Sequence, residues 1–185
     1  MIMQYKNISV ALGLILFTLV VRLVFHLPDA TPITAIALVS GFYLGRSWAV
    51  IVPLVALFLS DLLIGFYDWR VMLSVYGSFA LIGALSYILK KYPTVLTGIA
   101  LTAASSFLFF IVTNFAVWVF SPWYAKSLEG LMYCYTLGLP FYRNMFLGDA
   151  LYTPLLFGVF AYGSLAATHA RTMYSQLAQV LTAQV

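Results

Sequence analysis

Three ionisable side chains, Arg22, Asp61 and Asp149, lie within long apolar stretches of the sequence. A charged side chain at the centre of a membrane costs about 2.5–3.5 kcal/mol, and it costs less near the interface. Each is therefore expected to pair with an opposite charge or to bind a polar solute. Arg22 either extends to the outer headgroups or faces the helix bundle, where it pairs with Asp61, Asp149 or a ligand anion. A pair of Asp61 with Arg22 would lock two helices together, and this role is compatible with solute binding.

Asn114 and Trp118 lie one helical turn apart in a fifth apolar stretch. A buried amide in lipid must be hydrogen-bonded, either to a neighbouring helix or to a ligand. Because residues four apart share one face of a helix, we interpret the pair as an aromatic stacking surface above a polar anchor for a solute.

Residues 121–144 are too polar, and too often interrupted by glycine and proline, to span a membrane. They predict a mobile outer lid or an interfacial helix. Tyr124 and Tyr135 of this segment would pack on the solute, although aromatic belts also explain interfacial tyrosines. Cys134 is either a small apolar residue or a soft ligand for a metal-bearing solute such as a corrinoid.

The composition sets the environment in which these residues lie. Of the 185 residues, 64% are hydrophobic and 8% are charged, against about 25% charged residues in an average soluble domain. A soluble domain of this size could not bury so much apolar surface. The composition excludes a soluble enzyme, a disordered chain and a nucleic-acid-binding protein, and it predicts one integral membrane domain over residues 1–185.

Six apolar stretches are candidate transmembrane helices, because a span of ~30 Å needs ~20 apolar residues. They cover residues 8–27, 33–45, 48–65, 71–89, 95–120 and 145–167. The second is short, and ~13 residues rise only ~20 Å. It either tilts against its neighbours or lies partly in the membrane, shielded by protein.

The distribution of charge predicts that both termini lie in the cytoplasm. With this orientation five basic residues fall inside and three outside, and every acidic residue lies at the outer face or in the outer half of a span. The inner residues are Lys6, Arg46, Lys90, Lys91 and Arg171, the outer basic ones are Arg70, Lys126 and Arg143, and the acidic ones are Asp29, Asp61, Asp68, Glu129 and Asp149. Such asymmetry is typical of a protein that captures a polar solute from outside.

Motifs that would indicate other chemistry do not occur in the sequence. It contains no Walker A motif, no His-Glu-x-x-His zinc motif and no Gly-x-Ser-x-Gly elbow. We therefore expect no enzyme activity, no cofactor and no ATP hydrolysis by this chain. A membrane enzyme with an outward-facing site is the weakest hypothesis, because no nucleophile and base share a layer.

Several stretches carry a family resemblance and are spread over nearly the whole chain. They include residues 26–37 (HLPDATPITAIA), 60–62 (SDL), 75–80 (VYGSFA), 113–118 (TNFAVW), 140–144 (PFYRN) and 148–149 (GD). In these stretches the chain resembles a group of small bacterial membrane proteins described as transport proteins. That group is similar to the substrate-binding S-components of energy-coupling factor (ECF) vitamin transporters.

The resemblance implies a bundle of six transmembrane helices in the bacterial inner membrane, with both termini inside. It implies an outer solute pocket covered by the loops after the first, third and fifth helices. The solute would be vitamin-like, with a corrinoid as one candidate, and an ECF transmembrane and ATPase module would be a partner. The chain also resembles, in size and layout, the solitary cobalamin-type S-component, which holds cobalt with a cysteine in the loop after its third helix. Here that loop, residues 66–70 (FYDWR), has no cysteine.

The leading hypothesis is thus a membrane solute-uptake protein of S-component type. Its candidate substrate-binding residues are Arg22, Asp61, Asn114, Trp118, Tyr124, Tyr135, Arg143, Asn144 and Asp149. The alternative is a non-transporting scaffold subunit of a cell-envelope complex, in which the same polar groups only hold helices together.

Overall fold

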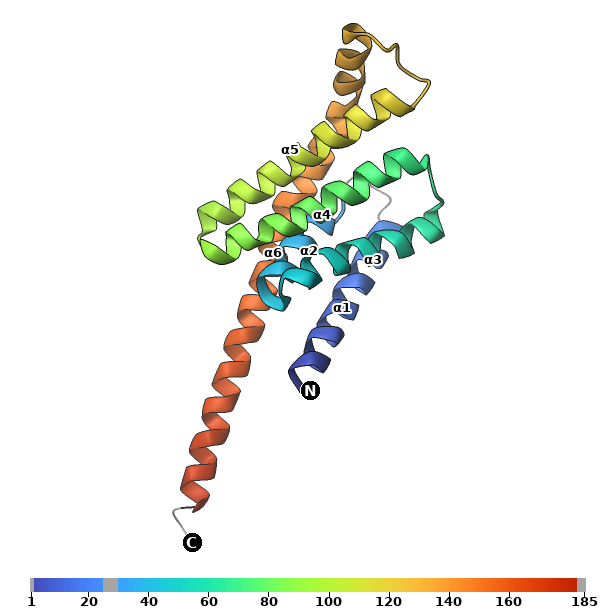
Figure 1. Cartoon of the computed structure of the whole chain (residues 1–185). Coiled ribbons are helices and arrows are strands. Elements are labelled where there is room, and N and C mark those ends of the chain that lie inside the picture. Colours follow the sequence, from blue (N-terminus) through green and yellow to red (C-terminus); the bar gives the residue numbers. More distant parts are fainter. Residues whose placement is uncertain (1, 25–29, 183–185) are drawn as a thin grey trace. The chain divides into compact units, whose positions relative to one another are not determined.

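The computed structural model describes residues 2–24 and 30–182, and the regular structure of this part is entirely helical (Figure 1). The expectation of an all-α protein is confirmed. His26 and Asp29 lie outside the described residues. The elements are α1 (Ile2–Val24), α2 (Ile33–Val39), the π-helical turn η1 (Ser40–Leu44), α3 (Arg46–Ile64), α4 (Trp69–Lys91), α5 (Val95–Phe120) and α6 (Leu128–Thr182).

Five of the described helices are long and apolar enough to cross a membrane. Their candidate spans are Asn7–Val24, Arg46–Ile64, Trp69–Lys91, Val95–Phe120 and Leu128–Leu165. The chain is accordingly a multi-pass membrane protein. The stretch expected to be the second span is a shorter apolar helix, Ile33–Leu44, which is below the ~17 residues that a crossing usually needs. All seven residues of α2 are buried, so the surrounding protein shields this short helix.

The segment 121–144 differs from the separate lid that its composition predicts. Only residues 121–127 form a connection, and α6 begins at Leu128 and continues through Gly138 and Pro140. Glycine and proline interrupt helices in water, but they are tolerated in membrane helices because neighbouring groups satisfy the freed backbone. The glycine and proline residues that suggested a break within residues 121–144 therefore do not interrupt α6.

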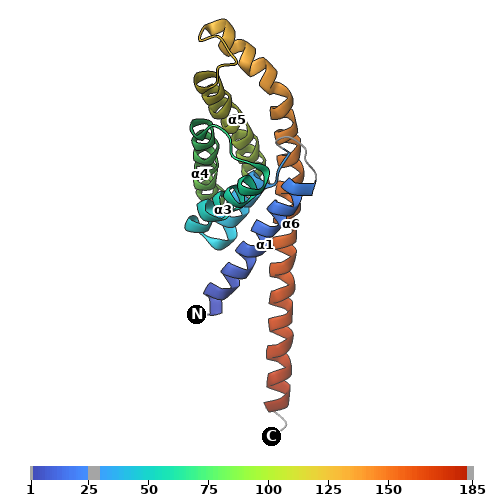
Figure 2. The same ribbon diagram turned by 90° about the vertical axis from the view of Figure 1, so that its right-hand side faces the viewer.

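The chain divides into two compact units, Met1–Thr153 and Pro154–Val185. In the first unit α3, α4 and α5 lie side by side in chain order, as Figures 1 and 2 show. The α2 and η1 turns contact both α3 and α4. Described residues of the second unit up to Thr182 form the rest of α6.

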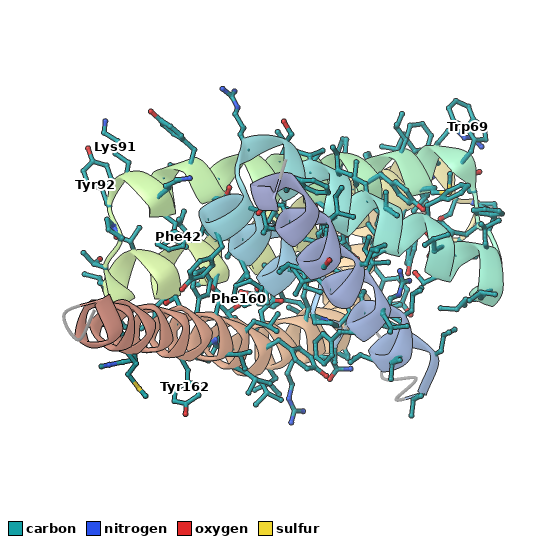
Figure 3. All side chains as sticks on the ribbon, turned by 90° about the horizontal axis from the view of Figure 1, so that it is seen from below. Phe42, Trp69, Lys91, Tyr92, Phe160 and Tyr162 are labelled. Atoms are coloured by element: carbon teal, nitrogen blue, oxygen red, sulfur yellow. The ribbon has the colours of Figure 1, made fainter. Side chains whose placement is uncertain are left out.

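The two ends of α4 differ in chemistry. Lys91 and the adjoining Tyr92 lie at one end, and Trp69 lies at the other (Figure 3). The carboxylate of Asp68 caps the Trp69 end by accepting a hydrogen bond of 2.9 Å from the backbone N–H of Arg70. The Arg70 guanidinium also bonds this carboxylate and holds the pKa of Asp68 below its usual range.

Close packing of α3 on α4 depends on glycine. A Cβ atom at Gly83 would overlap the backbone carbonyl of Ala49 on α3, whereas at Gly77 nothing lies within 4 Å. Helices in lipid gain much of their association energy from such close approach. Gly83 thus allows the backbones of α3 and α4 to meet.

We expect Gly83→Ala to lower the free energy of unfolding by about 1–3 kcal/mol, because the new methyl group forces the two helices apart. Gly77→Ala is the matched control on the same helix, and it should raise stability by up to about 1 kcal/mol through helix propensity. Thermal unfolding in lipid nanodiscs measures both. Equal melting temperatures for the two variants would contradict the close contact.

Candidate functional site

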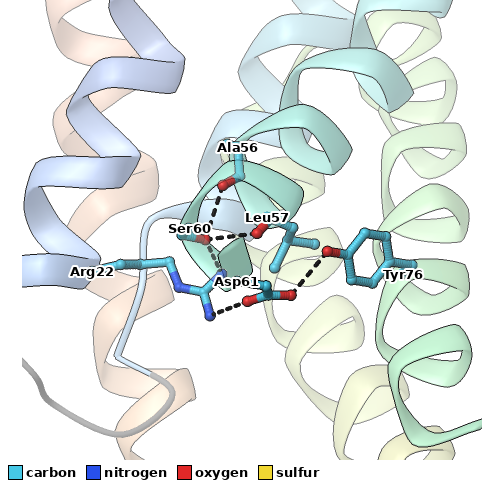
Figure 4. Close-up of polar contacts among 6 residues, drawn as sticks. All are labelled: Arg22, Ala56, Leu57, Ser60, Asp61 and Tyr76. Atoms are coloured by element: carbon cyan, nitrogen blue, oxygen red, sulfur yellow. Dashed lines mark hydrogen bonds and ion pairs between the residues drawn. The ribbon is translucent and has the colours of Figure 1, made fainter. Parts of the chain in front are cut away.

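An ion pair joins the end of α1 to the end of α3 (Figure 4). Arg22 Nη2 lies 3.1 Å from Asp61 Oδ1, and Arg22 Nη1 donates to Ser60 Oγ at 2.6 Å. The Arg22 side chain is 18% exposed and that of Asp61 is 2% exposed. The guanidinium therefore faces the bundle, and of the alternatives that the sequence left open for Arg22 the structure has the pair with Asp61.

A third helix completes this polar group. The hydroxyl of Tyr76 on α4 donates to Asp61 Oδ2 at 2.9 Å, so both carboxylate oxygens accept a hydrogen bond. The Ser60 hydroxyl donates to the carbonyls of Ala56 and Leu57, at 2.9 and 2.8 Å, and presents its lone pairs to Arg22. We call Arg22, Ser60, Asp61 and Tyr76 the Arg22 cluster. Every formal charge in it is compensated.

Tyr76 was not among the residues selected from the sequence. The signal that could have identified it is its phenol within an apolar helix, because a buried tyrosine hydroxyl usually has a partner. Nothing in the sequence showed that this partner would be Asp61, since 15 residues and a turn separate the two.

A cavity of about 220 Å³ opens beside the Arg22 cluster. Its lining combines one cation, two hydroxyl-bearing residues and a mainly apolar and aromatic wall: Arg22, Thr31, Ile33, Leu57, Tyr67, Val75, Phe79, Phe109 and Met145. Phe79 and Phe109 contact each other with ring centroids 4.9 Å apart. The guanidinium has more N–H donors than its bonds to Ser60 and Asp61 use. It can therefore donate to an acceptor on a solute without giving up its ion pair.

A second cavity, of about 20 Å³, shares the side chains of Phe109 and Met145 with the first. Asn114 lines it, and this volume has room for about one water molecule. The Asn114 Nδ2 group donates to the carbonyl of Phe110 on its own helix at 2.9 Å. A Cβ atom at Gly138 would overlap the Asn114 amide, so glycine lets α6 pack on this residue.

Asp149 is separate from the Arg22 cluster. It is fully buried on α6, and its Oδ2 accepts a hydrogen bond of 2.6 Å from Ser106 Oγ on α5. Its other oxygen, Oδ1, has no hydrogen-bond partner among the described residues. Arg22, Asp61, Asn114 and Asp149, four of the predicted substrate-binding residues, thus belong to three places: the Arg22 cluster, the small cavity at Asn114, and the buried carboxyl group of Asp149.

The predicted aromatic residues lie around the connection between α5 and α6. Trp118 Nε1 donates to the carbonyl of Ala125 at 2.9 Å, and the Tyr135 hydroxyl donates to that of Ile111 at 2.7 Å. The ring of Tyr124 contacts Tyr133 at 6.1 Å between centroids. None of the three predicted residues lines the cavity beside Arg22. The described contacts of Trp118 and Tyr124 hold the chain at residues 121–127, and Tyr135 joins α6 to α5.

Lys126 caps the C-terminal end of α5. The Lys126 ammonium donates to the carbonyl of Ser121 at 2.7 Å and to that of Trp118. A cation at this position satisfies the last carbonyls of a helix and favours its dipole. Polar contacts with the end of α5 therefore hold the connection at residues 121–127 in place.

The remaining predicted residues lie further along α6. Arg143 is exposed and Asn144 is half-buried, and neither lines either of the two cavities. The Cys134 thiol is buried and donates a long hydrogen bond of 3.5 Å to the carbonyl of Asn114. It is packed against α5 and lines neither of these two cavities.

Comparison with known protein families gives a match over nearly the whole chain. A family model matches residues 3–172, which include the Arg22 cluster, both cavities and Asp149. The chain belongs to DUF6580, a family of unknown function. Neither a curated protein nor a solved structure matches it.

The ion pair of this DUF6580 member generates a prediction about stability. Asp61→Asn leaves the Arg22 guanidinium without its counter-charge, and we expect a loss of about 3–5 kcal/mol of unfolding free energy. The double variant Arg22→Met with Asp61→Leu removes both charges and should lose less than Asp61→Asn alone. Denaturant unfolding in mixed micelles measures these differences.

The exposed pair of Arg70 and Asp68 provides the control, because their side chains are 43% and 39% exposed. Arg70→Gln should change stability by less than about 1 kcal/mol. A double variant as unstable as the single variant Asp61→Asn would show that the pair is not what stabilises this contact.

Proposed function

We propose that this DUF6580 protein is a membrane solute-binding protein that takes up a small solute from the extracytoplasmic side, as an ECF S-component does. Its partners would be the solute, the lipid bilayer and an ECF transmembrane and ATPase module, and its location the bacterial inner membrane. The observation that carries the proposal is the cavity beside Arg22. A guanidinium that still has N–H donors to offer, next to an aromatic wall, is an arrangement suited to ligand recognition.

The lining favours a particular kind of solute. Phe79, Phe109 and Tyr67 suit a flat apolar body, and Arg22 suits an acceptor oxygen or a carboxylate. The volume of about 220 Å³ is below the ~300–1,000 Å³ of pockets for drug-sized ligands. We therefore propose a solute of small vitamin size, because a corrinoid exceeds this cavity.

The path of the chain supports six membrane elements with both termini on one side. Arg22 near the end of α1 contacts Asp61 near the end of α3, so the chain must return between these two helices. The short helix Ile33–Leu44 makes this return. The guanidinium of Arg70, at the start of α4, lies 5.1 Å from the ring of Phe120, at the end of α5. The direction therefore alternates from α1 to α6, and the basic residue Lys91 belongs to the end assigned to the cytoplasm.

A scaffold subunit of a cell-envelope complex is the second candidate. The observation that favours it is the Arg22 cluster itself, because these hydrogen bonds join α1, α3 and α4 to one another. A scaffold requires the cluster but gives no role to the cavity. Blocking the cavity without touching the cluster therefore distinguishes the two functions.

Val75→Phe fills part of the cavity from α4, and Leu73→Phe places the same ring on an exposed position of that helix. We expect a small molecule to co-purify with the wild-type protein and with Leu73→Phe. The amount of this molecule per mole of protein should be at least about tenfold lower in Val75→Phe. Mass spectrometry of extracts from protein in nanodiscs measures this. If no molecule is depleted in Val75→Phe while all three proteins are folded, solute binding in this cavity is contradicted and the scaffold is favoured.

A further inference from the structure

Asp149 is the one described aspartate that combines complete burial with the absence of a cationic partner. The other buried aspartate, Asp61, is held by Arg22, and the exposed Asp68 is held by Arg70. Among the described residues, Asp149 has only the Ser106 hydroxyl as a hydrogen-bond donor, on one of its two oxygens. An ionised carboxylate in apolar surroundings is very costly without a counter-charge or several donors.

The elements around Asp149 contribute hydroxyl groups and no available charge. Thr34 of α2 faces the carboxyl group without reaching hydrogen-bond geometry, and neither α2 nor α5 contains a charged residue. On α1, Arg22 is already bonded to Asp61, and on α6 Arg143 is exposed. Tyr152, whose ring lies 6.2 Å from that of Phe17 on α1, is the nearest tyrosine along α6. These statements concern the described residues.

The carboxyl group lies close to the cavity lining along three elements. The lining residues Ile33 and Met145 are followed by Thr34 and Asp149 on α2 and α6, and the lining residue Phe109 is preceded by Ser106 on α5. The offset is one residue on α2 and one helical turn on α5 and α6. Because α5 runs away from the Lys91 end of the bundle while α2 and α6 run toward it, all three offsets point toward that end. The hydroxyl groups and the carboxyl group therefore form a polar layer under the apolar wall.

We propose that Asp149 is a reversible proton-binding site: in this structure its carboxyl group is protonated, and the proton is released only when water reaches it from the cavity above. A proton on Oδ1 turns the orphaned acceptor into a donor directed at the Thr34 hydroxyl, while Oδ2 keeps its bond from Ser106. Deprotonation transfers the proton to water and leaves a carboxylate that needs hydration. Proton release is thus linked to opening of the bundle at the cavity, which gives a membrane protein a means to respond to a proton gradient.

This inference goes beyond the proposed solute binding and does not depend on it. Infrared spectroscopy of the full-length protein in nanodiscs tests it through the C=O stretch of a protonated carboxylic acid. We expect this band at neutral pH in the wild type and in the control Asp68→Asn, where asparagine keeps the helix cap. The band should be absent in Asp149→Asn and should disappear from the wild type in alkaline buffer once the protein is opened by mild detergent.

A second variant keeps the test independent of how Asp149→Asn folds. Ser106→Ala removes the donor to Oδ2, so the band should persist and move to higher frequency. A wild type without the band overturns the proposal. So does a melting temperature that rises when sodium replaces potassium at constant ionic strength, provided that Asp149→Asn abolishes this rise, because the site would then hold a metal cation. Failure of the Val75→Phe experiment would leave the infrared result unaffected.

Discussion

The structure depends on how each polar group avoids exposure to hydrocarbon. Arg22 and Asp61 would each be costly alone within apolar helices, and together they cost far less. Their pairing brings the end of α1 to the end of α3, and the hydroxyl of Tyr76 adds α4. The short helix Ile33–Leu44 is then required as a return between α1 and α3, and its burial makes it part of the core.

The cavity lies beside this ion pair. The Arg22 cluster joins α1, α3 and α4 at one level, and the aromatic side chains of Phe79 and Phe109 leave a space of about 220 Å³ next to it. The Arg22 guanidinium, which has N–H groups not used by Ser60 and Asp61, then borders a mainly apolar wall. The same residue holds the helices together and offers a hydrogen-bond donor to a solute, so the structural and binding roles of Arg22 do not compete.

The two buried aspartates illustrate how a partner determines chemistry. Asp61 is bonded to a guanidinium and a phenol, whereas among the described residues Asp149 has a single serine hydroxyl bonded to it. Identical side chains at similar burial thus have different roles in the proposals made above: one anchors helices beside the cavity and the other stores a proton beneath it. Asn114 is of a third kind, since its amide donates to the carbonyl of Phe110 on its own helix.

The sequence by itself determined that the chain lies in a lipid bilayer and that its fold is helical. The reason is that 64% of its residues are hydrophobic and lie in long uninterrupted stretches, for which membrane helices are the stable structure. It also identified Arg22, Asp61 and Asp149 as the costly residues, since that cost depends on residue type and depth. Which of them meet was decided by the tertiary structure: Tyr76 joined Asp61, Asp149 has no cationic partner in the part of the chain that the structure describes, and Gly138 and Pro140 stayed within α6. Partner choice and helix continuity depend on contacts between segments distant in the chain, and one-dimensional spacing does not encode those distances.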